Sequence, residues 1–203
     1  MSVLLIAGSP SERSRSAALL DAVSQRIAAH GAAIDRLLIR DLSPQALLLA
    51  DVAHRSVLQA IDQVERARTI VVATPVYKAA YSGVLKLFLD VLPQSAFKGK
   101  AVLPLATGGS PHHMLALDYA LRPVLQSLAS RHILPGIYAT DAQVTLTPEG
   151  AYTVDGELSR RLDDAVENLA MEGHLSRSSR AVDFTSATAG FEPVPFSRVR
   201  CSV

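Results

Sequence analysis

Cysteine, tryptophan and excess charge are scarce in this sequence. Its 203 residues include one cysteine, Cys201, no tryptophan, and a formal net charge of only +1. A single thiol can form neither an internal disulfide nor a cysteine-based metal cluster, so we expect neither to hold the fold together. A net charge near zero creates no field that would recruit nucleic acid or an anionic membrane. We therefore expect neither nucleic acid nor a membrane as a partner.

Long apolar runs are also absent. No stretch reaches the length of a membrane span, and the opening MSVLLIAGSP lacks the basic start and the long apolar run of a secretory signal, which favours a cytoplasmic protein. Hydrophobic residues still make up 49% of the chain, enough to fill one domain, which we place at residues 1–175. Residues 176–203 show no periodicity, and we expect an irregular or disordered tail there.

Two common nucleotide-binding motifs are missing. The chain has no Gly-x-x-x-x-Gly-Lys-Ser/Thr sequence, which excludes a P-loop for a magnesium-bound nucleotide. It also has no Gly-x-Gly-x-x-Gly after its first apolar run, which excludes the dinucleotide fingerprint at that place. A phosphate site, if the chain has one, must be of another kind.

The first loop offers such a site. The apolar run Val3–Ala7 predicts a buried strand and ends at Gly8, and hydroxyl and guanidinium groups follow before a helix: Ser9, Ser11, Arg13, Ser14, Arg15 and Ser16. A helix N-terminus directs unpaired N–H groups and the positive end of its dipole at one point, which suits a terminal phosphate such as that of FMN. We interpret the loop as a phosphate cradle. The alternative is an ordinary strand-to-helix connection with a serine N-cap.

The chain alternates between strands and helices. Apolar segments predict strands at residues 3–7, 32–39, 69–74, 101–107 and 133–139, and helical spacing predicts helices around 19–27, 54–64, 83–92, 114–128 and 155–169. We expect residues 141–149 to be irregular. This alternation predicts an α/β fold: a flavodoxin-like doubly wound five-stranded parallel sheet with strand order 2-1-3-4-5. In that order the ends of strands one, three and four are neighbours, so their loops converge on one crevice.

The loops after strands three and four carry the other candidate residues. Pro75–Ser82 offers a rigid Pro-Val pair together with Tyr77 and Tyr81, which suit a flat, amphipathic ring. Thr107–Ser110 contains two glycines that let backbone amides approach the carbonyl edge of a flavin. The alternatives are aromatic packing for the first loop and a flexible turn for the second.

Two prolines predict local distortions of the backbone, and a histidine pair raises the question of a metal site. Pro104 lies inside the fourth strand, where we expect a bulge or an unpaired position, and Pro123 lies inside a helix, where we expect a kink or an extra-residue bulge. His112 and His113 are adjacent, so on a helix their side chains would diverge, and no carboxylate or cysteine stands near them at ligand spacing. We expect no metal site there.

Three segments resemble the NADPH-dependent FMN reductase family. They are AGSP with SRS (residues 7–10 and 14–16), ATPVYKAAYSG (73–83) and LPLATGG (103–109). With LDYAL (117–121), they resemble its sulfonate-desulfonation branch, whose FMN reductase is the partner of alkanesulfonate monooxygenase. The resemblance covers residues 1–172 and none of the tail.

The resemblance implies a role for each matching residue. The phosphate would be held by Ser9, Ser14, Arg15 and Ser16; the ring would be flanked by Pro75, Val76, Tyr77 and Lys78; its pyrimidine edge would be lined by Thr107, Gly108 and Gly109. Tyr119 matches an inserted aromatic residue that bulges the helix at the tetramer interface near the flavin. The family also implies a homotetramer that holds FMN loosely and releases reduced FMN.

The reaction implied is hydride transfer from NADPH or NADH to FMN. Hydride passes from nicotinamide C4 to flavin N5 between stacked rings, so no catalytic acid or base is expected. A quinone or azo reductase with tightly bound FMN would use the same fold and loops. A flavodoxin-type electron carrier is a further alternative, but such carriers are typically strongly acidic and this chain has a net charge of +1.

Overall fold

The computed structural model describes residues 2–147 and 151–175, so the predicted tail at 176–203 lies outside the described residues. A parallel sheet forms the centre of the molecule. Its strands lie in the order β2 (Ala33–Leu38), β1 (Ser2–Ala7), β3 (Ala67–Tyr77), β5 (Ala101–Gly108), followed by β6 (His132–Ile133) and β7 (Ile137–Thr140), which both pair with β5. Counted as five strands, this is the flavodoxin-like order 2-1-3-4-5, and the predicted fold is confirmed.

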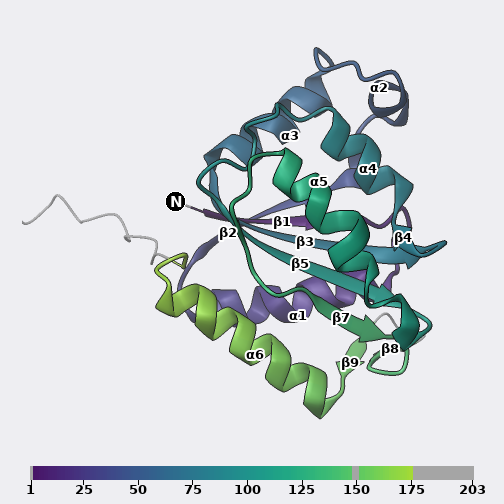
Figure 1. Ribbon diagram of the computed structural model, residues 1–203, viewed down its shortest axis with the longest axis vertical. Coiled ribbons are helices and arrows are strands. Elements are labelled where there is room, and N and C mark those ends of the chain that lie inside the picture. The colour runs from purple at the N-terminus through teal and green to yellow at the C-terminus, as the bar shows by residue number, and fades with distance from the viewer. Residues whose placement is uncertain (1, 148–150, 176–203) are drawn as a thin grey trace, which may run out of the picture.

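Helices cover both faces of the sheet (Figure 1). One face carries α1 (Arg15–Ala29) and α6 (Gly156–Met171); the other carries α2 (Pro44–Leu48), α3 (Arg55–Arg66), α4 (Gly83–Asp90) and α5 (Arg122–Ser127). Strands buried on both faces need apolar residues throughout, and β5 is buried at every position. Two hydrophobic cores result, one on each side of the sheet. Among the described residues, no helix combines the length and apolar character needed to cross a bilayer.

The predicted fifth strand is broken. β6 ends at Ile133 and β7 begins at Ile137, so the prediction of one strand over 133–139 was wrong. The break lies beside Pro104, because β5 pairs with β6 at Ala101 and Val102 and with β7 only from Leu105 onward. Pro104 has no N–H to donate, and the pairing of β5 with β3 continues past it without a shift. Of the two expected outcomes, the unpaired position is found and the bulge is not.

The helix predicted over 114–128 is two helical segments, preceded by a short turn. A 3-10 turn, η2 (Pro111–His113), leads to a π-helix, η3 (Leu117–Leu121), and then to α5. A π-helix contains the extra residue that the sequence predicted around Tyr119 and Pro123. Proline at the second position of α5 suits the first turn of a helix, where an N–H has no partner. The expected helix distortion is therefore confirmed, and the expected continuous helix is not.

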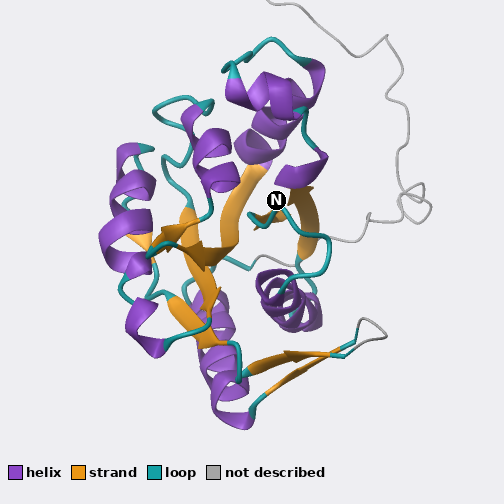
Figure 2. Ribbon diagram, turned by 90° about the vertical axis from the view of Figure 1, so that its right-hand side faces the viewer, coloured by secondary structure: helices purple, strands orange, loops and turns teal. Residues whose placement is uncertain are grey.

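Two smaller expectations also changed. Residues 141–149 are not wholly irregular, because β8 (Val144–Leu146) pairs with β9 (Tyr152–Val154) in an antiparallel hairpin that extends from the central sheet (Figure 2). The third strand continues beyond Pro75 and forms a hairpin with β4 (Ala80–Tyr81). On α3, Leu58 is exposed and Ala60 is buried. A 3-10 turn, η1 (Ile39–Asp41), follows β2.

Candidate functional site

The loops after β1, β3 and β5 meet at one cavity. Ala7 lies opposite Ala73 and Pro75 opposite Thr107, so the three strands end side by side. The cavity has a volume of about 250 Å³ and is lined by Ser11, Arg13, Ser14, Arg15, Pro75, Val76, Tyr77, Thr107, Gly108, Gly109 and Asp141. The predicted convergence of the three loops is confirmed.

Most of the residues predicted for the site line this cavity, and four do not. Ser9 and Ser16 are buried, with 3% and 1% of their surface exposed, beneath the loop. Lys78 lies at the tip of the hairpin between β3 and β4. Tyr119, on η3, is 78% exposed and lies outside the cavity lining.

The start of α1 is organised by serine hydroxyls. Ser14 is the N-cap residue, and its Oγ accepts a hydrogen bond from the Ala17 N–H at 3.1 Å. The same oxygen lies 3.3 Å from Oγ of Ser16. Ser9 Oγ accepts from the Ser11 N–H at 3.1 Å and so shapes the loop from inside. The serine N-cap predicted as an alternative is present, and it places the N-terminus of α1 at the cavity.

Asp141 was missed by the sequence analysis and holds Arg15 in place. A carboxylate oxygen of Asp141 lies 3.4 Å from Arg15 Nη1, and Arg15 Nε donates to the Val144 carbonyl at 3.1 Å. The Asp141 N–H in turn donates to the Gly108 carbonyl at 3.1 Å. The guanidinium group is thereby tied to both the third loop and the β8–β9 hairpin. No sequence spacing relates positions so far apart.

A buried hydroxyl network joins the strand ends. Ser82 Oγ donates to the Gly8 carbonyl and accepts from the Leu85 N–H at 3.3 Å, which makes Ser82 the N-cap of α4. Thr74 Oγ1 accepts from the Ser82 N–H at 3.0 Å. Both hydroxyl side chains are buried, and their hydrogen bonds connect the ends of β1 and β3 to the start of α4. Gly8 itself admits no side chain, since a Cβ would lie 2.9 Å from the Ala73 carbonyl oxygen.

The hairpin that carries Tyr77 has an unusual turn. Lys78 and Ala79 connect β3 to β4 with φ of 49° and 64°, both in the left-handed region. Two-residue hairpin turns of this kind normally use Asn-Gly or Asp-Gly, because other side chains are strained there. Tyr77, directly before the turn, is 50% exposed and contributes to the cavity wall. Backbone strain therefore lies next to the predicted ring site.

Tyr138 supports the third loop from beneath. Its hydroxyl donates to the Ser110 carbonyl at 2.6 Å, and it occupies the space that a side chain at Gly108 would need. Burial, and to a lesser degree the charge of Asp141, raise the pKa of Tyr138 above 10.0, so the hydroxyl keeps its proton at neutral pH. Sequence analysis did not select this residue, because a tyrosine within an apolar strand is normally packing.

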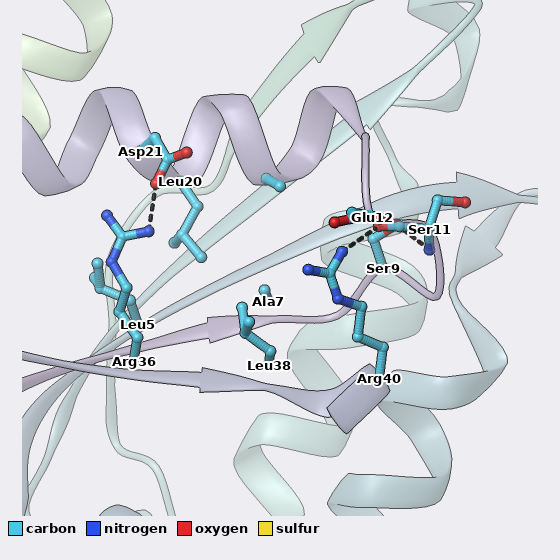
Figure 3. Close-up of a pocket in the computed structure, with 11 residues that line it drawn as sticks. Leu5, Ala7, Ser9, Ser11, Glu12, Leu20, Asp21, Arg36, Leu38 and Arg40 are labelled. Carbon is cyan, nitrogen blue, oxygen red and sulfur yellow. Dashed lines mark hydrogen bonds and ion pairs between the residues drawn. The ribbon is translucent and has the colours of Figure 1, made fainter. Parts of the chain in front are cut away.

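A second cavity, of about 200 Å³, lies on the other side of the first loop (Figure 3). Arg36 and Arg40 reach into it from β2 and η1, and both are engaged with the protein. Arg36 pairs with Asp21 on α1 and donates to Ser24 Oγ at 2.9 Å. Arg40 donates to the Ser11 carbonyl at 3.2 Å and so holds the loop from behind. Ser9 and Ser11 line this second cavity, whereas most of the candidate residues line the first.

Comparisons with known proteins agree with the geometry. A family model described as NADPH-dependent FMN reductase matches residues 1–145. An FMN reductase (NADPH) of Escherichia coli (strain K12) is 42% identical over 167 residues, which cover 82% of this chain and 87% of that protein. An FMN reductase (NADPH) of Pseudomonas putida is 42% identical over 184 residues, covering 90% of this chain and 92% of that protein.

A solved structure is similar over nearly the whole described chain. The apo form of an NADH:FMN oxidoreductase (EMOB) superposes with a TM-score of 0.76 at 40% sequence identity, covering 89% of this chain and 91% of that one. The family match spans the loops after β1, β3 and β5 that form the cavity. The chain therefore belongs to the NADPH-dependent FMN reductase family of oxidoreductases.

Proposed function

We propose that the protein reduces free FMN with NADPH or NADH and passes the reduced flavin to a flavin-dependent alkanesulfonate monooxygenase for sulfur acquisition. We assign this reaction to residues 1–175 and to the cytoplasm, where nicotinamide nucleotides are available. The observation that carries the reductase assignment is the cavity at the ends of β1, β3 and β5, which is lined by two arginines and by two glycines. The monooxygenase partner rests on the sequence resemblance of residues 117–121.

The groups at the start of α1 fit a phosphate. Arg13 and Arg15 line the cavity with one carboxylate, Asp141, so the side chains there leave an excess positive charge. The N-terminus of α1, a helix of 15 residues, adds N–H groups and the positive end of its dipole. In our proposal Ser14 and Arg15 bind the phosphate directly, whereas Ser9 and Ser16, being buried, shape the loop that binds it.

The rest of the cavity fits a flat ring. Pro75, Val76 and Tyr77 form an apolar wall, and Thr107–Gly109, which follow the neighbouring strand, present backbone beside it. Gly109 has space around it, since a Cβ would meet only Asp141 at 3.7 Å, so a ligand can approach its backbone closely. Lys78, at the hairpin tip, is placed to lie over the outer edge of a bound ring.

The chain's contribution to the reaction is binding and orientation. Bound FMN would supply the chemistry by accepting hydride at its ring from the nicotinamide. Pro75–Tyr77 would hold the flavin ring so that a second ring can stack on its open face, and backbone N–H groups near Gly108 would stabilise negative charge on the reduced ring. The residues that line the cavity include no cysteine and no histidine.

In our proposal the flavin dissociates after it is reduced, because release to a second enzyme requires it. A quinone or azo reductase would instead retain its flavin.

We also propose that the protein forms a homotetramer. Tyr119, Leu115 and Met114 are large apolar side chains in and before η3, and all three are at least half exposed. Clustered exposed apolar side chains are typical of surfaces that associate. The resemblance places Tyr119 at this interface. Light scattering of the wild type and of Tyr119→Ala tests the proposal, which requires a fourfold mass for the former and a smaller species for the latter.

The decisive experiment measures whether FMN is a substrate. Protein stripped of flavin is given NADPH or NADH under air, and nucleotide oxidation is followed while FMN is titrated from none to excess. We expect oxidation that saturates with added FMN, from protein that remains colourless after gel filtration. Yellow protein that ignores added FMN but consumes NADPH with a quinone would instead identify a quinone reductase. Yellow protein that oxidises neither nucleotide would identify an electron carrier.

A further inference from the structure

A group of metal-ligand side chains lies far from the flavin cavity. His132 in β6, Glu172 at the end of α6 and His174 just beyond it each direct one ligand atom to a common point, and these atoms all lie within 4.8 Å of one another. β6 pairs with the first residues of β5, so the group is at the edge where the strands begin. Figure 1 shows the yellow end of α6 on this side of the sheet, opposite the strand ends that form the cavity.

The chain positions Glu172 and His174 through a helix cap. Gly173 has φ of 76°, and the His174 N–H donates to the Leu169 carbonyl at 2.9 Å, the arrangement of a Schellman motif. This turn brings the side chains on both sides of Gly173 to the same place. Thr69 Oγ1 then donates to the His174 carbonyl at 2.9 Å, which fastens the turn to the first residues of β3. The group is therefore held by backbone geometry as well as by its own contacts.

Side-chain rotations are needed to bring the three ligand atoms onto one small tetrahedral ion, since their separations extend up to 4.8 Å. Two ligands about 2.0–2.1 Å from a tetrahedral zinc ion are separated by about 3.3 Å. Nε2 of His174 lies 3.4 Å from Oε2 of Glu172, close to that separation. Nε2 of His132 lies 2.7 Å from the same oxygen, so it would move outward by a few tenths of an ångström. The two imidazole rings have their centroids 4.8 Å apart, with planes tilted by 41°.

Charged side chains near His132, Glu172 and His174 affect which ion this group can hold. Glu172 supplies the negative charge, and among the described residues Arg68 is a cation near His174. Two imidazoles with one carboxylate are ligands for zinc and neighbouring divalent ions, whereas magnesium and calcium prefer oxygen ligands.

We propose that His132, Glu172 and His174 bind one divalent transition-metal ion, Zn²⁺ being the best match, with water completing the coordination. His132 and Glu172 are about half exposed, which leaves room for that water. Three protein ligands with an open position resemble exchangeable rather than closed structural sites. The ion would join the end of α6 to β6 and the start of the sheet. It would act on the stability of the fold and take no part in flavin reduction.

Zinc binding to flavin-free, tag-free protein tests this proposal. Calorimetric titration with ZnCl₂ should show one ion bound per chain, and Co²⁺ at the same site should give the visible absorption of a tetrahedral complex. The melting temperature with Zn²⁺ at about 100 times the dissociation constant should exceed that of metal-free protein in EDTA by about 5 °C. His132→Gln and Glu172→Gln should each weaken zinc binding by about tenfold or more.

Two matched controls separate this site from other histidines. His30, the C-cap residue of α1, pairs with Glu167 on α6 at 3.8 Å. Because this is a single imidazole–carboxylate pair, His30→Gln should leave the affinity for zinc unchanged. His112 and His113 are exposed neighbours, and the double change to Gln should also have no effect. Circular dichroism in EDTA verifies that each variant is folded. Absence of saturable binding to the wild type, or full affinity in folded His132→Gln, would overturn the proposal.

Discussion

The hydroxyl of Tyr138 occupies the position that a side chain at Gly108 would need: a Cβ built there would lie 2.5 Å from that oxygen. The third loop of the cavity is thus supported by a side chain from β7, the next strand in the sheet. Packing alone therefore requires glycine at position 108.

This relationship predicts a compensating pair of substitutions. Gly108→Ala should lower the free energy of unfolding by about 2 kcal/mol and raise the KM for FMN, because the loop must move away from Tyr138. In a Tyr138→Phe background the oxygen is gone, and the same alanine should cost less than about 1 kcal/mol. Chemical denaturation of the four proteins measures the coupling. Equal losses in the two backgrounds would show that the clash is relieved in another way.

Tyr138 also predicts a pH dependence. Burial first, and then the charge of Asp141, raise its pKa above 10.0, so between pH 10.0 and the raised pKa the folded state holds a proton that the unfolded state has lost. The free energy of unfolding should therefore be unaffected by this group below pH 10.0 and should fall as pH rises above it. Burial also raises the pKa of Tyr81 and Tyr152. Tyr138→Phe should make the decline shallower without abolishing it, which denaturation at several alkaline pH values will show.

Arg15 and Asp141 should have opposite effects on FMN binding. Arg15→Ala removes a charged donor to the phosphate and should raise the KM for FMN about tenfold, whereas Asp141→Asn frees the guanidinium group and should lower it about threefold. Riboflavin has no phosphate, so Arg15→Ala should change its KM little. Arg66→Ala, which breaks an exposed ion pair with Asp62 on α3, is the matched control. Equal effects of Arg15→Ala on both flavins would argue against phosphate binding at this residue.

The strained hairpin turn predicts a stabilising substitution. Glycine adopts φ near 64° without strain, so Ala79→Gly should raise the free energy of unfolding by about 0.5–1 kcal/mol. Ala129 has the same φ after α5, far from the cavity, and Ala129→Gly should stabilise by a similar amount. Only the change at Ala79 should alter the KM for FMN, because that turn follows Tyr77. Thermal unfolding and steady-state kinetics of both variants test the distinction, and a loss of stability at either position would refute the assignment of strain.

The sheet order and the convergence of the three loops could be predicted because they depend on local signals. Apolar runs mark the buried strands, and glycines, prolines and serines mark where they end. The π-helix was also predictable, since Pro123 cannot continue the hydrogen bonding of an ordinary helix. These features are properties of neighbouring residues.

The features that were missed depend on pairs of distant residues. The hydroxyl of Ser82 is paired with Gly8, and Arg15 with Asp141, by the fold alone. The break in the fifth strand reflects the proline in its neighbour as much as its own Pro135 and Gly136. His132 lies in a strand, whereas Glu172 and His174 lie at the end of the last described helix. Their separation in the sequence gives no indication that the three side chains meet. Periodicity cannot reveal contacts of this kind.

The break between β6 and β7 also affects how the molecule meets its neighbours in solution. An uninterrupted edge strand presents a row of free N–H and C=O groups, onto which another chain can add and start aggregation. Here the outer edge of the sheet is divided into two short pieces by Leu134, Pro135 and Gly136, and proline has no N–H to offer. Strand addition at this edge is therefore disfavoured, which helps to keep the protein from aggregating at the concentrations found in a cell.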